Sequence, residues 1–215
     1  MPRIRKEKKL RIITELQKLY PDPETELDYK NSFELLVAVI LSAQCTDKKV
    51  NEVTPALFKD YPNFKKLSKA KLEDIKKIIK PINYYKTKSK HLILMANRVV
   101  DVFDNKLPTQ FDDLISLNGV GQKTANVVQS ELGIRPAIAV DTHVFRVSQR
   151  LGFAKGKTPN EIEEQLKKGF KKELWRDLHH WLILHGRRVC KAQKPLCSSC
   201  SLAKDCPSSN IKLIK

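Results

Sequence analysis

The longest apolar stretch in this chain is Phe33-Glu-Leu-Leu-Val-Ala-Val-Ile-Leu41, which would be apolar on nearly every side of a helix. A helix without a polar face has to be enclosed by protein, so this stretch is expected at the centre of a core. It is far shorter than the roughly 20 apolar residues that span a membrane. The sequence therefore predicts a globular domain built around residues 33–41.

The segments around this stretch have the apolar spacing of amphipathic helices, and no segment alternates convincingly as a β-strand does. Helices are predicted over residues 1–20, 32–41, 48–58, 69–79, 88–102, 122–132, 141–151, 158–170 and 174–189, with a short one after Thr109. The sequence therefore predicts an all-α fold.

Local signals place individual helix faces and ends. In the first predicted helix, the expected inner face consists of Leu10, Ile13, Leu16 and either Leu19 or Tyr20. Thr109 begins a sequence typical of a capping box, and Asp141 is typical of a helix N-cap. Residues 80–87, between two predicted helices, are expected to form a polar and aromatic loop.

The charge of the chain limits its partners. It has 41 Lys and Arg residues against 24 Asp and Glu residues, a net charge of +17 at pH 7. Such an excess favours a polyanion, either nucleic acid or an anionic membrane surface, although a lysine-rich proteome gives the same composition. The N-terminus has no apolar stretch beside its charges, so no secretory signal is expected. Five cysteines, an odd number, are expected to be reduced thiols in the cytoplasm.

Four of the five cysteines lie close together near the C-terminal end. Cys190, Cys197, Cys200 and Cys206 have the spacing C-x6-C-x2-C-x5-C, and Pro207 follows the last of them. A zinc knuckle usually pairs two short C-x2–4-C clips, whereas only one short clip is present here. Longer chain segments between the cysteines suit the larger size of a [4Fe–4S] cluster, and a Cys-Pro ending also occurs in bacterial ferredoxins. The spacing favours an iron–sulfur cluster and leaves zinc, disulfides and free thiols open.

Two glycines, Gly119 and Gly121, separate a predicted helix that ends near Leu117 from the next one. Glycine permits the positive φ angles and close backbone approach of a tight turn. The amides that start the second helix, with the positive end of its dipole, form an anion site, and Thr124 adds a hydroxyl donor. The stretch is either a plain turn between helices or a clamp that grips one DNA phosphate without reading sequence.

Lys123 lies in the first turn of that second helix. Most lysines of a basic protein are solvated surface residues. The positive end of the dipole disfavours the charged form of this one, which would free its amine to attack a sugar carbon. Asp141 has an ordinary interpretation as an N-cap. It also has a chemical one, as a carboxylate that stabilises oxocarbenium-like charge or takes a proton from the amine.

Four separated motifs together resemble the endonuclease III family of helix-hairpin-helix DNA glycosylases. They are Leu117-Asn-Gly-Val-Gly-Gln-Lys-Thr-Ala-Asn-Val-Val128, Ala139-Val-Asp-Thr-His-Val-Phe-Arg146, Leu41-Ser-Ala-Gln44 with Thr46-Asp47, and the cysteine spacing. Their order and spacing agree with the family over almost the whole chain.

The resemblance implies a bifunctional DNA glycosylase and AP lyase of base excision repair. Such an enzyme removes oxidised pyrimidines from duplex DNA and cuts the strand 3′ to the abasic site by β-elimination. By motif position, Lys123 is the Schiff-base nucleophile and Asp141 the essential carboxylate. The implied cofactor is a [4Fe–4S] cluster held by Cys190, Cys197, Cys200 and Cys206.

The family architecture has two helical domains with a DNA-binding cleft between them. The resemblance implies a six-helix barrel over residues 25–135, with the helix-hairpin-helix at about 109–132. It assigns residues 1–24 and 136–215 to the domain that holds the cluster. The expected partner is double-stranded DNA with damaged pyrimidines or abasic sites. We expect a monomer in the cytoplasm, associated with the nucleoid while it acts.

The resemblance also predicts DNA contacts at Gln44, Tyr84, Gly119, Gly121, Thr124, Lys191 and Lys194. Gln44 matches the residue that fills the space left when the damaged base flips out of the stack. Tyr84 departs from the family pattern, since a leucine-like residue is expected in this wedge loop. An aromatic ring can stack on a base, so we expect the wedge role to survive with an altered preference for the damage and the opposite base.

Two other interpretations fit part of the sequence. An adenine-specific mismatch glycosylase shares the hairpin, the aspartate and the cluster, but that relative lacks a lysine at the position of Lys123. A non-enzymatic DNA-binding module with a structural zinc site is the second. Iron and visible-region absorption in the purified protein would exclude zinc.

Overall fold

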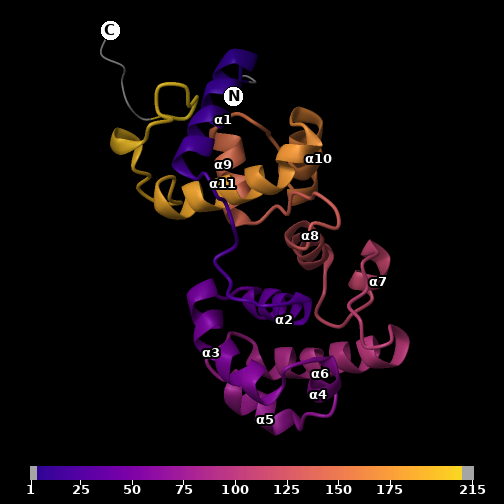
Figure 1. The fold of residues 1–215 in the computed structure, drawn as a ribbon. Coiled ribbons are helices and arrows are strands. Elements are labelled where there is room, and N and C mark those ends of the chain that lie inside the picture. Colours follow the sequence, from indigo (N-terminus) through magenta and orange to yellow (C-terminus); the bar gives the residue numbers. More distant parts are fainter. Residues whose placement is uncertain (1–3, 210–215) are drawn as a thin grey trace. The chain divides into compact units, whose positions relative to one another are not determined.

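The computed structural model describes residues 4–209 of the chain. Every regular element in this range is a helix, which confirms the all-α prediction there. The chain divides by its contacts into two compact units (Figure 1). We call Glu26–Arg135 the hairpin unit, and we call the residues up to Thr25 together with those from Pro136 onward the cysteine unit. None of the helices in residues 4–209 combines the length and the apolar character needed to cross a membrane.

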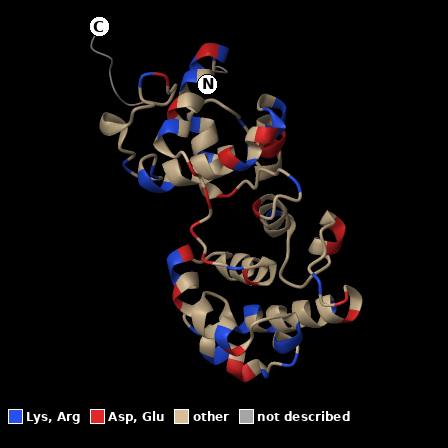
Figure 2. Ribbon diagram, in the orientation of Figure 1, with Lys and Arg blue, Asp and Glu red and all other residues tan. Residues whose placement is uncertain are grey.

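Each unit has its own set of helices. Those of the hairpin unit are α2 (Ser32–Ser42), α3 (Asp47–Asp60), α4 (Phe64–Leu67), α5 (Leu72–Ile78), α6 (Tyr85–Val102), α7 (Phe111–Ile115) and α8 (Gln122–Glu131). Those of the cysteine unit are α1 (Lys6–Leu19), α9 (Thr142–Arg150), α10 (Pro159–Gly169) and α11 (Trp175–Arg188), with short 3-10 helices η1 (Lys172–Leu174) and η2 (Cys197–Ser199). Lys and Arg occur on helices of both units (Figure 2).

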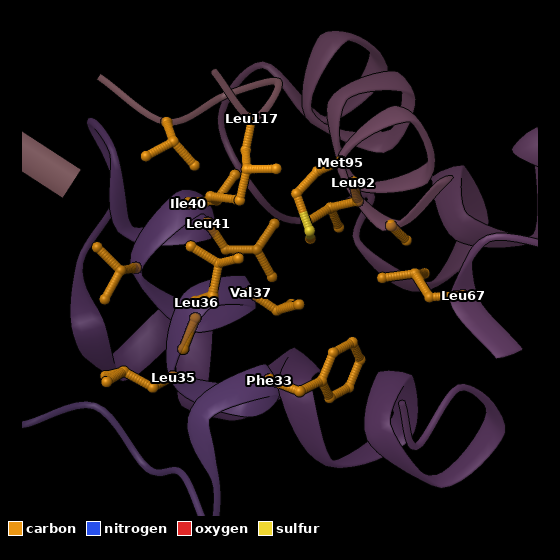
Figure 3. Close-up of a cluster of buried hydrophobic side chains, with 14 of the residues drawn as sticks. Phe33, Leu35, Leu36, Val37, Ile40, Leu41, Leu67, Leu92, Met95 and Leu117 are labelled. Atoms are coloured by element: carbon orange, nitrogen blue, oxygen red, sulfur yellow. The ribbon is translucent and has the colours of Figure 1, made fainter. Parts of the chain in front are cut away.

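The helix α2 is enclosed by the rest of the hairpin unit, as its composition predicts. Phe33 and all residues from Leu35 to Leu41 are buried, and α3, α6 and α8 pack against α2. Figure 3 shows side chains of α2 beside Leu92 and Met95 of α6 and beside Leu117. Removal of this apolar surface from water stabilises the unit and fixes the three surrounding helices relative to α2.

A reciprocal cap starts α2. The side chain of Asn31 accepts a hydrogen bond from the amide of Glu34 at 3.0 Å. The carboxylate of Glu34 accepts one in turn from the amide of Lys30 at 2.8 Å. Glu34, the single charged residue in the apolar stretch, therefore caps the start of the helix and does not enter the core.

The predicted capping box at Thr109 is wrong. Helix α7 begins at Phe111 after Gln110, and no side-chain hydrogen bond caps it within the described residues. The carbonyl of Thr109 instead accepts a hydrogen bond from Nε2 of Gln129 in α8, at 2.7 Å. This partner is distant in sequence, so the local pattern does not reveal it.

Several predicted helix boundaries shift. The loop predicted over residues 80–87 is shorter, because α6 begins at Tyr85. Helix α5 begins at Leu72 and not at residue 69. The short helix α4, which apolar spacing does not predict, precedes it and is capped by the side chain of Asn63.

The inner face of α1 agrees with the predicted one except at its first residue. Ile13, Leu16 and Tyr20 are buried as predicted, together with Ile12, whereas 67% of Leu10 is exposed. Leu10 precedes Ile12 by two residues, a rotation of about 200° in an α-helix, so the two side chains point to opposite sides. Helix α1 packs on α11, and the indole N–H of Trp181 donates to the carbonyl of Tyr20 at 2.9 Å.

The face of α1 can be tested with two substitutions in the same helix. Leu16→Ala is expected to lower the free energy of unfolding by about 2–5 kcal/mol, because it leaves a cavity at a fully buried position. Leu10→Ala is the matched control and is expected to change it by less than about 0.5 kcal/mol. Urea unfolding followed by tryptophan fluorescence measures both, since Trp175 and Trp181 lie in the same unit. Equal effects would contradict the described face.

Candidate functional site

The two glycines of the hairpin between α7 and α8 meet different requirements. Gly119 has a φ of +83°, and a Cβ there would lie 3.2 Å from the Cβ of His91 on α6. Gly121 has a φ of −97°, which any residue can adopt, and a Cβ there would meet no atom of the described chain within 4 Å. Gly119 is therefore required by backbone conformation and packing, whereas Gly121 leaves space beside the first turn of α8.

The N-terminus of α8 carries no side-chain cap. Gly121 is the N-cap, and no side-chain hydrogen bond to the helix start is found within residues 4–209. By contrast, Asn31, Thr46 and Asn63 cap α2, α3 and α4 with their side chains. The first amides of an α-helix lack partners inside the helix, so those of α8 are available to an anion. Helices α1, α5, α6 and α7 also begin without a side-chain cap, so α8 differs from them by the glycine turn and the lysine beside its first amides.

Lys123 and Thr124 are the second and third residues of α8. Lys123 is exposed and Thr124 is half-buried. Ala125 and Val128 of the same helix are fully buried, and α8 packs on α2. The amine of Lys123 is therefore presented to solvent by a helix that the core of the hairpin unit holds in place.

Gln44 and Tyr84 lie in two loops that a hydrogen bond joins. The side-chain amide of Asn83 donates to the carbonyl of Gln44 at 2.6 Å. Gln44 has a φ of 55° and Tyr84 a φ of 58°, and both side chains are exposed. The left-handed region costs a residue with a side chain about 1–3 kcal/mol unless its surroundings enforce it, and such residues cluster at functional sites. The structure thus brings together two of the predicted DNA contacts.

Asp141 is the N-cap of α9, which confirms that prediction. Its Oδ1 accepts hydrogen bonds from the amides of His143 at 2.8 Å and Val144 at 2.7 Å. Its Oδ2 has no hydrogen-bond partner in the part of the chain that the structure describes. Asp141 is half-buried, and one oxygen of its carboxylate is fixed by the amides at the start of α9. Asp141 belongs to the cysteine unit, and Lys123 to the hairpin unit.

Two arginines of α9 bind the loop between Cys190 and Cys197. Nε of Arg146 donates to the carbonyl of Cys190 at 3.2 Å. Arg150 donates to the carbonyls of Lys191 at 2.7 Å and Ala192 at 3.0 Å, and to the sulfur of Cys190 at 3.5 Å. These bonds hold the backbone of the loop, while the side chains of the predicted DNA contacts Lys191 and Lys194 are exposed.

The four clustered cysteines line one pocket of the cysteine unit. Its empty space, including the part open to solvent, is about 320 Å³. The remaining wall is mainly apolar and includes Leu151, Val189, Leu196, Leu202 and Ala203. All four are free thiols, so the disulfide alternative is not observed among the described residues.

The chemistry of the pocket favours a group that neutralises thiolates. Burial raises the pKa of the Cys200 and Cys206 thiols, and the charges of the neighbouring cysteines raise it further. Four thiolates in this pocket would therefore require a positively charged group among them. No three Cys, His, Asp or Glu side chains within residues 4–209 converge as a site for a single metal ion. The sulfurs that line the pocket are the type of donor that an iron–sulfur cluster or a zinc ion uses.

A buried histidine borders the same pocket. Burial lowers the pKa of His185 to about 4, so its ring is neutral at pH 7. Its Nε2 lies 3.7 Å from the sulfur of Cys200, and its Nδ1 lies 3.4 Å from the hydroxyl of Tyr20. A neutral imidazole carries a proton on only one ring nitrogen. If the hydroxyl of Tyr20 donates to Nδ1, that proton is on Nε2, and the N–H points to the sulfur of Cys200.

Sequence reasoning missed three polar residues of these sites. Arg146 and Arg150 lie four residues apart on α9, a spacing that places them on one helix face and that could have indicated a shared role. Asn83 gave no comparable signal, because its partner is a main-chain carbonyl in a distant loop.

Comparison with known proteins identifies relatives of the whole chain. The family model described as "HhH-GPD superfamily base excision DNA repair protein" matches residues 37–172. Endonuclease III of Synechocystis sp. is 43% identical over 206 residues, which cover 95% of this chain and 94% of that protein. Endonuclease III of Escherichia coli K12 is 42% identical over 201 residues, which cover 94% of this chain and 95% of that protein.

Solved structures agree with the sequence relatives. A trapped endonuclease III–DNA covalent intermediate has a TM-score of 0.89 and 42% identity, and the match covers 96% of this chain and 98% of that one. A non-covalent endonuclease III–DNA complex has a TM-score of 0.91 and 42% identity, with coverage of 96% and 97%. Since these relatives match nearly the whole chain and the family model covers more than half of it, the protein belongs to the endonuclease III family of the HhH-GPD superfamily.

Proposed function

We propose that Lys123 and Asp141 perform the chemistry of this DNA glycosylase and AP lyase, which removes oxidised pyrimidines from duplex DNA. The observation that carries the proposal is the position of Lys123, an exposed amine in the uncapped first turn of α8. A backbone phosphate bound by the amides of that turn would bring a nucleotide sugar close to the amine. The endonuclease III relatives, one of them solved as a covalent intermediate on DNA, support the same assignment.

The reaction begins at C1′ of the flipped nucleotide. The neutral amine of Lys123 attacks C1′, the bond from C1′ to the base breaks, and the base leaves with a proton. Opening of the sugar ring then gives an iminium between C1′ and the lysine nitrogen. The iminium makes a proton on C2′ acidic, and its removal expels the 3′ phosphate by β-elimination. Hydrolysis of the iminium finally returns the free amine.

Asp141 supplies the negative charge that the first step needs. Positive charge develops on the sugar as the base departs, and a nearby carboxylate stabilises it. Because Oδ1 already accepts two amide hydrogen bonds, Oδ2 is the oxygen that would stabilise the positive charge of the sugar and accept the proton of the amine. The two N-cap bonds hold the carboxylate in place during the reaction.

The remaining predicted contacts bind and open the duplex. Gln44 would fill the space of the flipped nucleotide, and the exposed ring of Tyr84 would stack on a neighbouring base. Lys191 and Lys194 would contact phosphates from the Cys190–Cys197 loop. Because contacts of basic residues with phosphates would dominate the affinity, DNA binding should weaken steeply as salt is added.

The cofactor of this proposal is a [4Fe–4S] cluster held by Cys190, Cys197, Cys200 and Cys206. Its role is structural, since it would fix the ends of the loop that carries Lys191 and Lys194. Arg150 already binds that loop through two carbonyls. Thiolates that ligate such a cluster need a reducing compartment, so we place the protein in the cytoplasm, at the nucleoid while it acts.

Borohydride reduction on duplex DNA with thymine glycol tests the nucleophile. Wild-type protein is expected to give a covalent adduct, and Lys123→Gln to lower its yield more than roughly 100-fold while DNA still binds. Lys106→Gln, at another exposed lysine, is the control and should react as wild type does. Release of the base by wild-type protein without any trapped adduct would contradict the Schiff base.

Asp141→Asn separates the charge of Asp141 from its role as a cap. Asparagine is as good an N-cap as aspartate, so the unfolding midpoint should barely change. Turnover on the same duplex is expected to fall roughly 100- to 10,000-fold, because the carboxylate is lost. Single-turnover kinetics and thermal unfolding measure the two effects. Retained turnover would leave Asp141 with a purely structural role.

Iron content tests the cofactor. The purified protein is expected to contain iron and to absorb visible light, and Cys197→Ala should lose both. Cys45→Ala, at the cysteine of the hairpin unit, is the matched control and should keep both. A colourless protein loaded with zinc would show that the cofactor assignment is wrong.

A further inference from the structure

Lys88 of α6 is buried, with 6% of its surface exposed, while the other lysines of the described chain are at least partly exposed. Its Nζ donates to the carbonyl of Leu41 at 2.8 Å and to that of Ala43 at 2.6 Å. Both partners are main-chain oxygens and not carboxylates. A buried ammonium is unfavourable unless its hydrogen bonds are satisfied, and burial lowers the pKa of Lys88. A residue of this kind is expected to have a specific task.

The two carbonyls lie where α2 ends, immediately before Gln44. The last carbonyls of an α-helix have no partner inside the helix, and the negative end of the dipole lies there. The ammonium of Lys88 therefore caps the C-terminus of α2. Only one residue beyond Ala43, the chain adopts the left-handed conformation of Gln44 that presents its side chain to solvent.

The main chain of Lys88 binds the second loop. Its amide donates to the carbonyl of Tyr84 at 3.0 Å, as part of the first turn of α6. Asn83, the residue before Tyr84, donates through its side-chain amide to the carbonyl of Gln44. Lys88 is thus hydrogen-bonded through its side chain to the segment that leads into Gln44 and through its backbone to Tyr84. The backbone bond forms with any side chain at position 88, so the ammonium of Lys88 acts on the segment before Gln44, and Asn83 links that segment to the loop of Tyr84.

We propose that Lys88 is a positioning residue that, with Asn83, holds Gln44 and Tyr84 as one rigid pair for insertion into the duplex. The inference rests on the proposed function, because it presupposes that these two side chains fill and flank the space of the flipped nucleotide. A pair that is fixed before binding avoids the entropy cost of ordering two loops on the DNA. More of the free energy of the contacts is then left to offset the cost of unstacking the base. Lys88 itself does not touch the DNA.

The role predicts a selective defect. Lys88→Met removes the ammonium and keeps most of the side-chain length. On a duplex with paired thymine glycol it is expected to lower kcat/KM roughly 10- to 100-fold, the effect of losing hydrogen bonds to a charged group. On a duplex whose thymine glycol lies within a short unpaired bubble, little unstacking is needed, and the loss should stay below about threefold. Lys88→Arg, which keeps the charge and the donors, should restore part of the activity.

Two further variants and one direct readout complete the test. Ser89→Ala removes a different buried hydrogen bond, to the carbonyl of Tyr85, and should leave the ratio of the two substrates unchanged. Asn83→Ala removes only the bond to Gln44 and should shift the ratio in the same direction as Lys88→Met, which keeps the test valid if that variant does not fold. A 2-aminopurine opposite the lesion should brighten on binding wild-type protein and much less on binding Lys88→Met.

The outcomes are distinguishable. Equal losses on the paired and the bubble substrates would mean that Lys88 only maintains the folded site, and no loss on either would mean that it positions nothing. Both results would overturn the inference while the proposed function stands. Absence of wild-type lyase activity on both substrates would instead overturn the proposed function, and this inference with it.

Discussion

Enclosure of α2 by apolar side chains is the constraint on which the hairpin unit depends. A helix with no polar face forces α3, α6 and α8 to surround it, and a core packed at the density of a solid holds these helices in fixed positions. The exposed residues of interest lie at the ends of these helices. Gln44 follows α2, Tyr84 precedes α6, and Lys123 lies in the first turn of α8. The packed core thereby fixes the positions of exposed side chains that themselves contribute little to stability.

The cysteine unit uses α9 in a comparable way. The N-terminus of α9 is capped by Asp141, and farther along the helix Arg146 and Arg150 bind the loop that begins at Cys190. One helix therefore positions a carboxylate proposed for catalysis and a loop proposed for DNA binding. The inner side of α9 packs on α11 through buried Val144 and Val147, which keeps both ends of this arrangement fixed relative to the core.

Much of the fold follows from the sequence, but interactions with distant main-chain groups do not. Apolar spacing predicts the helices and the burial of α2, and Asp141 signals its own cap because its partners lie two and three residues away. Leu10 is misplaced because spacing alone does not define which face meets a neighbour. Thr109 is misassigned because its partner lies in α8. Lys88 resembles any surface lysine in the sequence, and only the end of α2 makes it a buried cap.

The central claim is that the amine of Lys123 forms the covalent bond to the sugar. Proteolysis of the borohydride-trapped complex followed by peptide mapping with mass spectrometry locates that bond. The account predicts a reduced sugar adduct on the peptide that contains Lys123, with the mass assigned to its Nζ. An adduct on any other amine of the protein, including the buried Lys88, would contradict it.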